Sequence, residues 1–423
     1  MMQLNKDFYK GMVAGFLLSL VVIYSFFRIY WLMEVGLKYF RWHALLWLYS
    51  SIALVFFGIS YVLYKKGKLK SPRAQKVYLV ALGLFAGWYL AEGFLRLTKE
   101  GMTYMEQREG VFINPAEMMF KNWYMKWPPG EKLEMHTGEY AFTRLSNTAG
   151  FSDDEWTTPK DSNEIRLMTL GDSFTEGDGC ATDSAYPKVL KQLLQKEFPN
   201  LKITVMNAAR RGSDPWFEYK KLHDLLLPYQ PDIVVYTNSS NDMFFDHLNY
   251  GGMERFKPDT TVTNRIPHHW WLGIFEVSYL FRQLVYKMGY DQSFFSAAQR
   301  AQNDTAAITE ARQLSVWYSQ LAQQNNFTCI QLLRPDRYEI ETSEFNFKPQ
   351  QLTQGLDTLP NYATFDMLAY YRDSLHIAGV EKTAPYFWKI DGHHNATGYA
   401  LMAQAVAIAV KNEVAKKAET LHR

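Results

Sequence analysis

The sequence is poor in cysteine. Its 423 residues include only two, Cys180 and Cys329. Two thiols are too few for the disulfide framework of a small secreted domain, and their separation is not a metal-ligand spacing. They either pair with each other or are small buried side chains, and we expect the second arrangement.

The sequence also lacks an excess of one charge. It has 45 Lys and Arg residues against 43 Asp and Glu, which gives a formal net charge of +2. No basic tract is interleaved with aromatic residues, as a nucleic-acid groove requires, so we expect no nucleic-acid partner. Internal repeats and low-complexity segments are absent as well. The length suits two or three structural units.

Three long apolar runs lie in the first hundred residues. They cover residues 11–32, 44–64 and 77–97. Each approaches the roughly 20 residues that a helix needs to cross the hydrocarbon core of a bilayer. A signal peptide would instead be a single short run followed by a cleavage site. The sequence therefore predicts a membrane domain over residues 1–98 with three transmembrane helices.

The loops between these runs predict the orientation in the membrane. The loop between the first two runs has only two basic residues, whereas the next loop has Lys65, Lys66, Lys68, Lys70, Arg73 and Lys76. By the positive-inside rule the more basic loop is cytoplasmic. The N-terminus is then inside, and the chain after residue 97 lies on the periplasmic or extracellular side. We predict a multi-pass protein of the cytoplasmic (inner) membrane.

Glu92 lies within the third run, where a carboxylate is costly unless it reaches the interface or a partner. Arg96 follows one turn later, so an i,i+4 ion pair near the outer surface is the expected arrangement. A contact with another envelope membrane protein is the alternative.

Strand and helix patterns alternate from residue 164 onward. Short apolar runs typical of buried strands occur at residues 165–170, 203–209, 231–238 and 327–335. Helical spacing of apolar residues covers residues 186–198, 216–227 and 396–417. This alternation predicts an α/β fold, a flavodoxin-like parallel sheet with helices on both faces.

The sequence before and within this region predicts two further segments. Residues 99–163 are rich in turn formers and are expected to be an extended connecting region. Residues 164–423 form the sheet domain, with an insertion at about 243–326 that contains a helix over 275–288. The insertion carries His268-His269-Trp270-Trp271. These side chains either form a substrate-facing lip or pack the insertion onto the domain or the membrane surface, and we expect packing.

Four polar clusters fall where ligands bind in parallel sheets, beyond the carboxyl ends of the strands. GDSFTEG follows the first strand, NAARRG the second and NSSND the third, and DGHHN precedes the last helix. A serine at a strand-to-helix turn is exposed, and its own N–H points into the space where an oxyanion forms. The fourth cluster supplies the acid and the histidine that a serine nucleophile needs.

In order, strand context and spacing, these clusters resemble those of the SGNH/GDSL hydrolase superfamily, whose four blocks contribute Ser, Gly, Asn and His. GDSFTEGDG, with the preceding NTAGFSDDEW, is similar to the exported bacterial branch that acts on cell-envelope material. The resemblance covers the chain from about residue 145 to the C-terminus. The three apolar runs lie outside it.

The resemblance implies roles for individual residues. Ser173 would be the nucleophile, and the N–H of Gly212 and the side chain of Asn241 would complete an oxyanion hole with the N–H of Ser173. Ser239 stands where the third block of the family usually has glycine. Asp172 is expected to hold the turn by hydrogen bonds.

Two neighbouring histidines compete for the role of general base. The D-x-x-H spacing from Asp391 selects His394, whereas the pattern H-x-N-x-x-G, completed by Asn395 and Gly398, selects His393. Members of the exported branch with D-G-H-x-N also favour His393. We take His393 as the catalytic histidine, with Asp391 orienting its imidazole, and keep His394 as the alternative.

The resemblance implies a Ser-His-Asp acyl-enzyme mechanism on an ester, with no metal or organic cofactor. We expect a membrane-anchored serine esterase that acts on O-acyl groups, above all O-acetyl, of envelope polysaccharide, because the site faces outward from the membrane. The alternatives are an O-acyltransferase to envelope glycan, a lipase or lysophospholipase with a lipid substrate, and a non-catalytic partner of an envelope-assembly complex.

Overall fold

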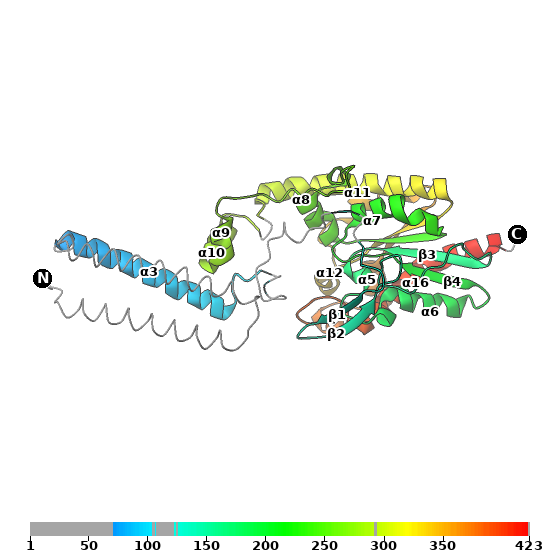
Figure 1. Cartoon of the computed structure of the whole chain (residues 1–423), viewed down its shortest axis with the longest axis horizontal. Helices are drawn as coiled ribbons and strands as arrows, with labels where there is room; N and C mark the ends of the chain where they lie inside the picture. The colour runs from blue at the N-terminus through cyan, green and yellow to red at the C-terminus, as the bar shows by residue number, and fades with distance from the viewer. Residues whose placement is uncertain (1–70, 104–105, 107–121, 124–125, 292–293, 422–423) are drawn as a thin grey trace. The chain divides into compact units, whose positions relative to one another are not determined.

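Two compact units divide the chain. The computed structural model describes residues 71–103, 106, 122–123, 126–291 and 294–421 (Figure 1). The sheet unit consists of Pro115–Pro267 and Ser293–Arg423, and the N-terminal unit of Met1–Asn114 and His268–Gln292. The predicted membrane runs at residues 11–32 and 44–64 lie outside the described residues.

The sheet unit is built on a five-stranded parallel sheet. Its strands are β3 (Glu164–Leu170), β4 (Lys202–Asn207), β5 (Ile233–Asn238), β6 (Thr328–Leu333) and β7 (Tyr362–Asp366). Their spatial order is β4-β3-β5-β6-β7, and every neighbouring pair is parallel. The first strand of the sheet thus lies between the second and the third, as in flavodoxin-like folds. The predicted α/β fold is confirmed, and β7 is a strand that the sequence did not predict.

Successive strand residues point to opposite faces of the sheet, and both faces carry buried apolar side chains. Helices therefore cover both faces. On one side α6 (Tyr186–Glu197) and α16 (Ala396–Leu421) pack on residues such as Ile165 and Leu167. On the other side α7 (Pro215–Lys221) and α11 (Ala297–Asn325) pack on residues such as Met168 and Leu170. Figure 1 shows α7 and α11 above the sheet and α6 below it.

Shorter elements connect these layers. They are α5 (Ser173–Glu176), α8 (His247–Tyr250), α12 (Arg337–Thr342), α13 (Pro349–Thr353), α14 (Met367–Ala369) and α15 (Val380–Thr383). The helix predicted over residues 216–227 forms as α7 and continues in a π-helical turn, Leu222–Leu226.

The two cysteines are free and buried, as expected. Cys180 belongs to the core cluster that contains α6, and Cys329 belongs to the cluster on the opposite face of the sheet. The sheet therefore separates the two thiols, which explains why they do not pair.

The segment expected to be an extended connection is in large part a structured portion of the sheet unit. Strands β1 (Lys132–His136) and β2 (Ala141–Leu145) form an antiparallel hairpin. Phe151 follows it and is buried in the core beside α7 and α11. The predicted boundary at residue 163 was too late. The exposed residues that alternate along the hairpin gave no indication in the sequence that this segment packs on the core.

The segment expected to be an insertion is also divided differently. Helix α11 lies within the predicted 243–326 range, yet its Ala307, Ala311, Leu314 and Tyr318 face the sheet as part of the core. Only residues 268–292 join the N-terminal unit. The helix was not predicted because its many Gln, Asn, Thr and Arg residues dilute its apolar stripe.

The described part of the N-terminal unit contains helices α3 (Pro72–Thr98), α9 (Leu272–Val277) and α10 (Tyr279–Lys287). The predicted helix over 275–288 is interrupted at Ser278, whose hydroxyl accepts a hydrogen bond from the N–H of Phe281 at 3.1 Å and caps α10. His269 stacks on the buried Trp271, with ring centroids 4.5 Å apart. The His-Trp segment therefore packs within the N-terminal unit, whereas the expected packing was onto the sheet domain or the membrane surface, and Trp270 is 87% exposed.

Glu92 of α3 is buried against α10 of the same unit. Its carboxylate accepts hydrogen bonds from the N–H groups of Tyr279 at 2.8 Å and Leu280 at 2.9 Å. Arg96 donates to it at 2.8 Å, which is the predicted i,i+4 pair. A carboxylate at a helix N-terminus is favourable because it meets unsatisfied N–H groups and the positive end of the helix dipole. The contacts of Glu92 are thus made within the chain.

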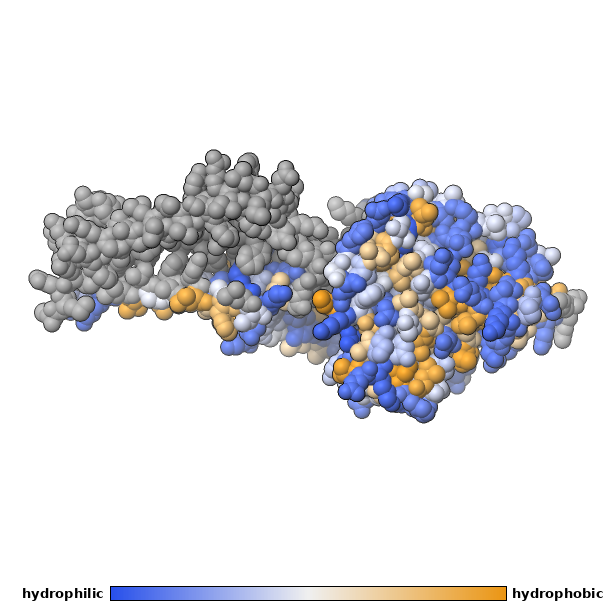
Figure 2. Space-filling view, turned by 90° about the horizontal axis from the view of Figure 1, so that it is seen from below, coloured by the Kyte–Doolittle hydropathy of each residue, from blue (hydrophilic) through white to orange (hydrophobic). Residues whose placement is uncertain are grey.

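The third predicted run forms helix α3, and several of its large apolar side chains are exposed. They are Val80, Leu84, Leu90 and Phe94, and Figure 2 shows orange residues along this helix. Among the helices of the described residues, none combines the length and hydropathy of a membrane span.

Candidate active site

Ser173 is held at the carboxyl end of β3 by the residues just before it. Asp172 is the N-cap of α5, and its carboxylate accepts a hydrogen bond from the N–H of Phe174 at 2.9 Å. The other carboxylate oxygen accepts from Arg334 at 3.2 Å. A Cβ at Gly171 would lie 2.2 Å from Oγ1 of Thr175, so this tight approach requires glycine. Asp172 therefore has the turn-holding contacts expected of it.

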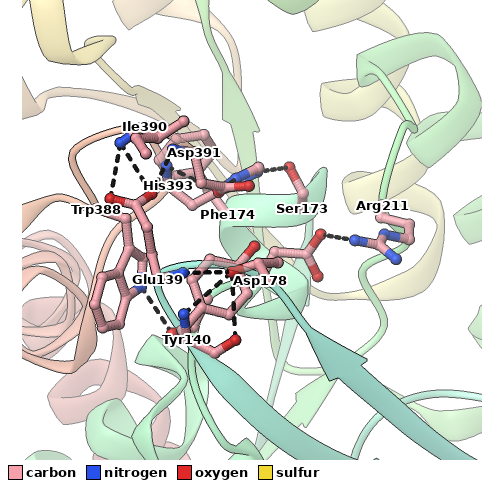
Figure 3. A network of polar contacts seen from close by, with 12 residues as sticks. Glu139, Tyr140, Ser173, Phe174, Asp178, Arg211, Trp388, Ile390, Asp391 and His393 are labelled. Carbon is pink, nitrogen blue, oxygen red and sulfur yellow. Dashed lines mark hydrogen bonds and ion pairs between the residues drawn. The ribbon is translucent and has the colours of Figure 1, made fainter. Parts of the chain in front are cut away.

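Ser173, His393 and Asp391 form a chain of hydrogen bonds (Figure 3). Nε2 of His393 lies 2.7 Å from Oγ of Ser173. Nδ1 of the same ring is hydrogen-bonded to Oδ1 of Asp391. When Nδ1 carries the proton that Asp391 accepts, Nε2 is free to accept the Ser173 hydroxyl proton. This is the arrangement that activates a serine as a nucleophile.

His394 lies in a different environment, although it is the next residue. Its side chain is 2% exposed, and its Nδ1 lies 3.0 Å from the carbonyl oxygen of Tyr386. Burial lowers the pKa of His394 to about 3, so the ring is neutral and Nδ1 donates to that carbonyl. The structure brings His393, and not His394, to Ser173.

The downstream motif explains why the two rings diverge. Asn395 accepts a hydrogen bond from the N–H of Gly398 at 3.1 Å and starts helix α16. A Cβ at Gly398 would lie 2.5 Å from Nδ1 of His394 and 2.1 Å from the carbonyl oxygen of Tyr386. The glycine thus makes room for the buried His394, while the same turn leaves His393 directed toward the nucleophile.

The loop after β4 carries Gly212 and is bonded to the nucleophile turn. The N–H of Arg210 donates to the carbonyl oxygen of Gly171 at 3.1 Å, and the hydroxyl of Ser213 contacts the same oxygen at 2.9 Å. The N–H of Arg211 donates to Glu176 at 2.6 Å. Gly212 itself is exposed and has a φ of 73°, in the left-handed region that favours glycine.

Asn241 begins the π-helical segment Asn241–Asp246 that follows β5 and is exposed. Ser239, which stands where the SGNH/GDSL pattern that the sequence resembles has glycine, does not have a positive φ. Its hydroxyl accepts a hydrogen bond from the N–H of Asp242 at 3.2 Å. Serine therefore fits this backbone without strain and adds a cap to the turn. Because β4, β3 and β5 are neighbours, the loops with Gly212, Ser173 and Asn241 leave the same edge of the sheet.

Arg334 is a central residue of the site that the sequence did not reveal. It follows β6, is 2% exposed, and contacts Asp172 and Asp336, each at 3.2 Å. Its guanidinium lies 4.0 Å from the ring centroid of Phe174. Burial alone would lower the pKa of Arg334, but the surrounding carboxylates raise it, so the group stays charged. It joins the loop after β6 to the nucleophile turn.

A second buried network connects the hairpin to the C-terminal end of α5. Arg144 of β2 contacts Asp178 at 3.1 Å and also donates to the carbonyl oxygen of Gly177. Arg211 is paired with the same aspartate. Trp127 donates to Glu176 at 2.7 Å. The only sequence signal for this network was the density of charges around residues 176–178 and 210–211, which has no specific meaning by itself.

The described residues contain no group of three or more His, Cys, Asp or Glu side chains arranged to hold a metal ion. The contact between Oγ of Ser173 and Nε2 of His393 offers proton transfer between these two groups at the carboxyl edge of the sheet.

Comparisons with known proteins give distant structural similarities. No family model and no curated protein matches the sequence. A two-domain esterase active on acetylated mannans is 13% identical with a TM-score of 0.35, over 59% of this chain and 49% of its own. An acetylxylan esterase from Geobacillus stearothermophilus is 13% identical with a TM-score of 0.36, over 58% and 94%. An α/β hydrolase from the metagenome of Lake Arreo, Spain, is 12% identical with a TM-score of 0.37, over 58% and 95%. This chain thus spans about half the length of the first of these proteins.

Proposed function

We propose that the chain is a membrane-anchored serine esterase of the SGNH/GDSL type that removes O-acyl groups, above all O-acetyl, from cell-envelope polysaccharide. The observation that carries this proposal is the contact of 2.7 Å between Oγ of Ser173 and Nε2 of His393, with Asp391 bonded to the other ring nitrogen. A nucleophile, a base and an orienting acid are thereby assembled at the carboxyl edge of a parallel sheet, where ligands bind in such folds.

In the first half of the proposed reaction, Oγ of Ser173 attacks the ester carbonyl while its proton passes to Nε2 of His393. Asp391 stabilises the imidazolium that results. The carbonyl oxygen becomes an oxyanion, which the N–H of Ser173, the N–H of Gly212 and the side chain of Asn241 would hold. The N–H of Ser173 belongs to the first residue of α5, where no intrahelical acceptor exists. Collapse breaks the ester bond, and His393 gives its proton to the departing sugar oxygen, which leaves as a hydroxyl.

In the second half, water attacks the acyl-enzyme carbonyl and gives one proton to His393. The second tetrahedral intermediate collapses to the free carboxylic acid, and Ser173 recovers its proton from the imidazolium. A sugar hydroxyl in the place of water would make the same protein an O-acyltransferase. The loss of one oxyanion donor is expected to cost about 10²–10³-fold in kcat.

Acetate release from acetylated xylan and mannan by the purified full-length protein tests the reaction. We expect the wild type to release acetate and Ser173→Ala to be slower by about 10⁴-fold or more. Release of fatty acid from lysophospholipid without any acetate would favour a lipase. Movement of the acyl group to an added glycan acceptor would favour a transferase. Full restoration of a deletion strain by Ser173→Ala would instead favour a non-catalytic partner in envelope assembly.

The anchoring and sidedness in this proposal are supported by the three apolar runs and the basic loop of residues 65–76. The exposed apolar side chains of α3 are consistent with them. Single introduced cysteines test the topology, because both native thiols are buried and burial raises the pKa of Cys180 to about 12. In intact spheroplasts a membrane-impermeant maleimide should label Lys196→Cys on α6, whereas Lys68→Cys should be labelled only after lysis. The reverse pattern would contradict the proposed sidedness.

A further inference from the structure

The tip of the β1–β2 hairpin lies against the loop that carries Asp391 and His393. Residues 137–140 connect the two strands, and the N–H of Thr137 donates to the carbonyl oxygen of Tyr140 at 2.9 Å. The hydroxyl of Thr137 also accepts the N–H of Glu139 at 3.2 Å. The turn therefore has a defined shape that presents Glu139 at its end.

Glu139 binds the backbone of the acid loop directly (Figure 3). Its carboxylate oxygens accept hydrogen bonds from the N–H of Ile390, both at 2.9 Å. Oε2 also accepts the N–H of Asp391 at 2.7 Å. These are charge-assisted bonds, and they join residues separated in the sequence by 251 positions (Glu139 and Ile390) and 252 positions (Glu139 and Asp391).

The acid loop is closed by its own backbone hydrogen bonds, from the N–H of Trp388 to the carbonyl oxygen of His393 at 2.9 Å and from the N–H of Gly392 to that of Trp388 at 3.3 Å, and Glu139 adds an acceptor from outside the loop. Ile390 is 64% exposed, and Gly392 has a φ of 80°, so the backbone around Asp391 turns at the surface. The direction of the Asp391 side chain follows from its backbone, and Oδ1 of this side chain meets Nδ1 of His393. An acceptor that holds the N–H of Asp391 therefore also holds the acid in place.

The hairpin also contacts the segment after α5, directly through Arg144 and indirectly through Trp388 of the acid loop. The ring of Tyr140 lies 5.3 Å from that of Trp388, whose indole N–H donates to the carbonyl oxygen of Gly179 at 2.9 Å. Arg144 at the other end of β2 contacts Asp178 at 3.1 Å. The tip of the hairpin is thus joined through β2 to the segment that follows Ser173 and α5.

We propose that Glu139 is a positioning residue of the active site, which acts through the backbone of Asp391 to keep His393 aligned with Ser173. This inference rests on the proposed function and goes beyond it, because it gives Glu139, a residue outside the four polar clusters, a part in the reaction. Glu139 does not touch the reacting atoms. It restricts the acid loop to the arrangement in which Asp391 meets Nδ1 of His393.

Three variants of the full-length protein test this role. Glu139→Ala removes the acceptor. Glu139→Gln removes the charge but keeps one oxygen, which at the position of Oε2 can accept both N–H groups. Glu134→Ala is the matched control, because Glu134 lies in the same hairpin, is exposed and is paired with Lys132 on the same strand. Each variant is assayed for ester hydrolysis well below its Tm, with kcat and KM determined separately.

We expect Glu139→Ala to lower kcat by about 10–100-fold, which is the usual effect of losing a residue that orients a functional group through a hydrogen bond. KM should be nearly unchanged. Glu139→Gln should recover most of kcat, and Glu134→Ala should match the wild type. A kcat of Glu139→Ala within twofold of the wild type would overturn the inference. So would an equal loss in Glu139→Ala and Glu139→Gln if the Tm values of the two variants fell together.

The proposed function and this inference fail in distinguishable ways. If wild type and Ser173→Ala hydrolyse esters equally, the proposed function is wrong. If Ser173→Ala is inactive while Glu139→Ala keeps the wild-type kcat, the function stands and the positioning role is lost. Should Glu139→Ala fail to fold, Glu139→Gln decides alone, because low kcat with unchanged Tm in that variant contradicts the role of the oxygen acceptor.

Discussion

The two loops that meet at the active site combine local and distant supports in different proportions. The nucleophile turn shows its local supports in its own motif, since Gly171 provides the space and Asp172 caps the helix that Ser173 begins. The acid loop has local backbone hydrogen bonds, and Glu139 of a distant hairpin also accepts the N–H of Asp391. A motif whose stabilising contacts come from its own residues can be recognised in a sequence. A motif that also needs contacts from a distant segment is recognised only in part.

The largest expected effect concerns the acid loop. In Asp391→Asn the amide can present a donor to Nδ1 of His393 and favour the wrong tautomer. We expect kcat to fall by about 10³–10⁴-fold while the fold is retained. Hydrolysis assays with a circular dichroism spectrum of the variant would check this. A loss of less than tenfold would show that the contact between Asp391 and His393 is not needed for the reaction.

The next effect concerns the nucleophile turn and is one of stability. Asp172→Ala removes the cap of α5 and one partner of the buried Arg334. We expect the free energy of unfolding to fall by about 2–4 kcal/mol, because a buried cation loses an ion pair and a helix loses its cap. Thermal unfolding would register this as a Tm lower by several degrees. Asp183→Ala, an exposed aspartate in a neighbouring turn, is the control and should leave Tm unchanged.

A smaller effect is expected at the second histidine. His394→Asn keeps a donor near the carbonyl oxygen of Tyr386 but loses ring packing against Phe387, whose centroid lies 4.2 Å away. We expect Tm to fall and kcat to stay within about tenfold of the wild type, because this ring makes no contact with Ser173. A variant with the wild-type Tm and no activity would contradict the assignment of the two histidines.

The smallest effect is a pH dependence beneath the nucleophile turn. Glu218 is hydrogen-bonded to Ser213, and burial raises the pKa of Glu218 from 4.5 to about 7 although Lys221 opposes this. A carboxyl with a higher pKa in the folded state binds its proton more tightly there, so stability falls as pH rises from about 4.5 to about 7. Glu218→Gln stays neutral throughout. The free energy of unfolding of this variant relative to the wild type should therefore increase between pH 5 and pH 8, by at most about 3 kcal/mol. Its Tm relative to the wild type should rise over the same range. A Tm difference that does not change with pH would contradict this linkage.

The sequence predicted those parts of the fold whose signals are local. Buried apolar runs revealed β3, β4, β5 and β6, because these strands have helices on both faces. Strand β7 was missed because it has only five residues, of which one is buried, whereas the other edge strand, β4, has four buried residues among its six. Helix α11 was taken for part of an insertion, since only a narrow stripe that includes Leu314 and Tyr318 meets the core.

The same distinction applies to the candidate site. The turn around Ser173 and the pattern after His393 were visible, because each contains the glycines and caps that its own geometry needs. The contacts of Glu139, Arg144 and Arg334 were not visible. They join segments far apart in the sequence, and a single charged residue in a polar stretch carries no signal of its partner.

The most direct test of the central claim is the rate at which a fluorophosphonate probe labels the protein. We expect label on the wild type and on His394→Asn, none on Ser173→Ala, and a rate reduced by about 10³-fold or more for His393→Ala. Label that persists in Ser173→Ala, or that is lost in His394→Asn but kept in His393→Ala, would contradict this expectation.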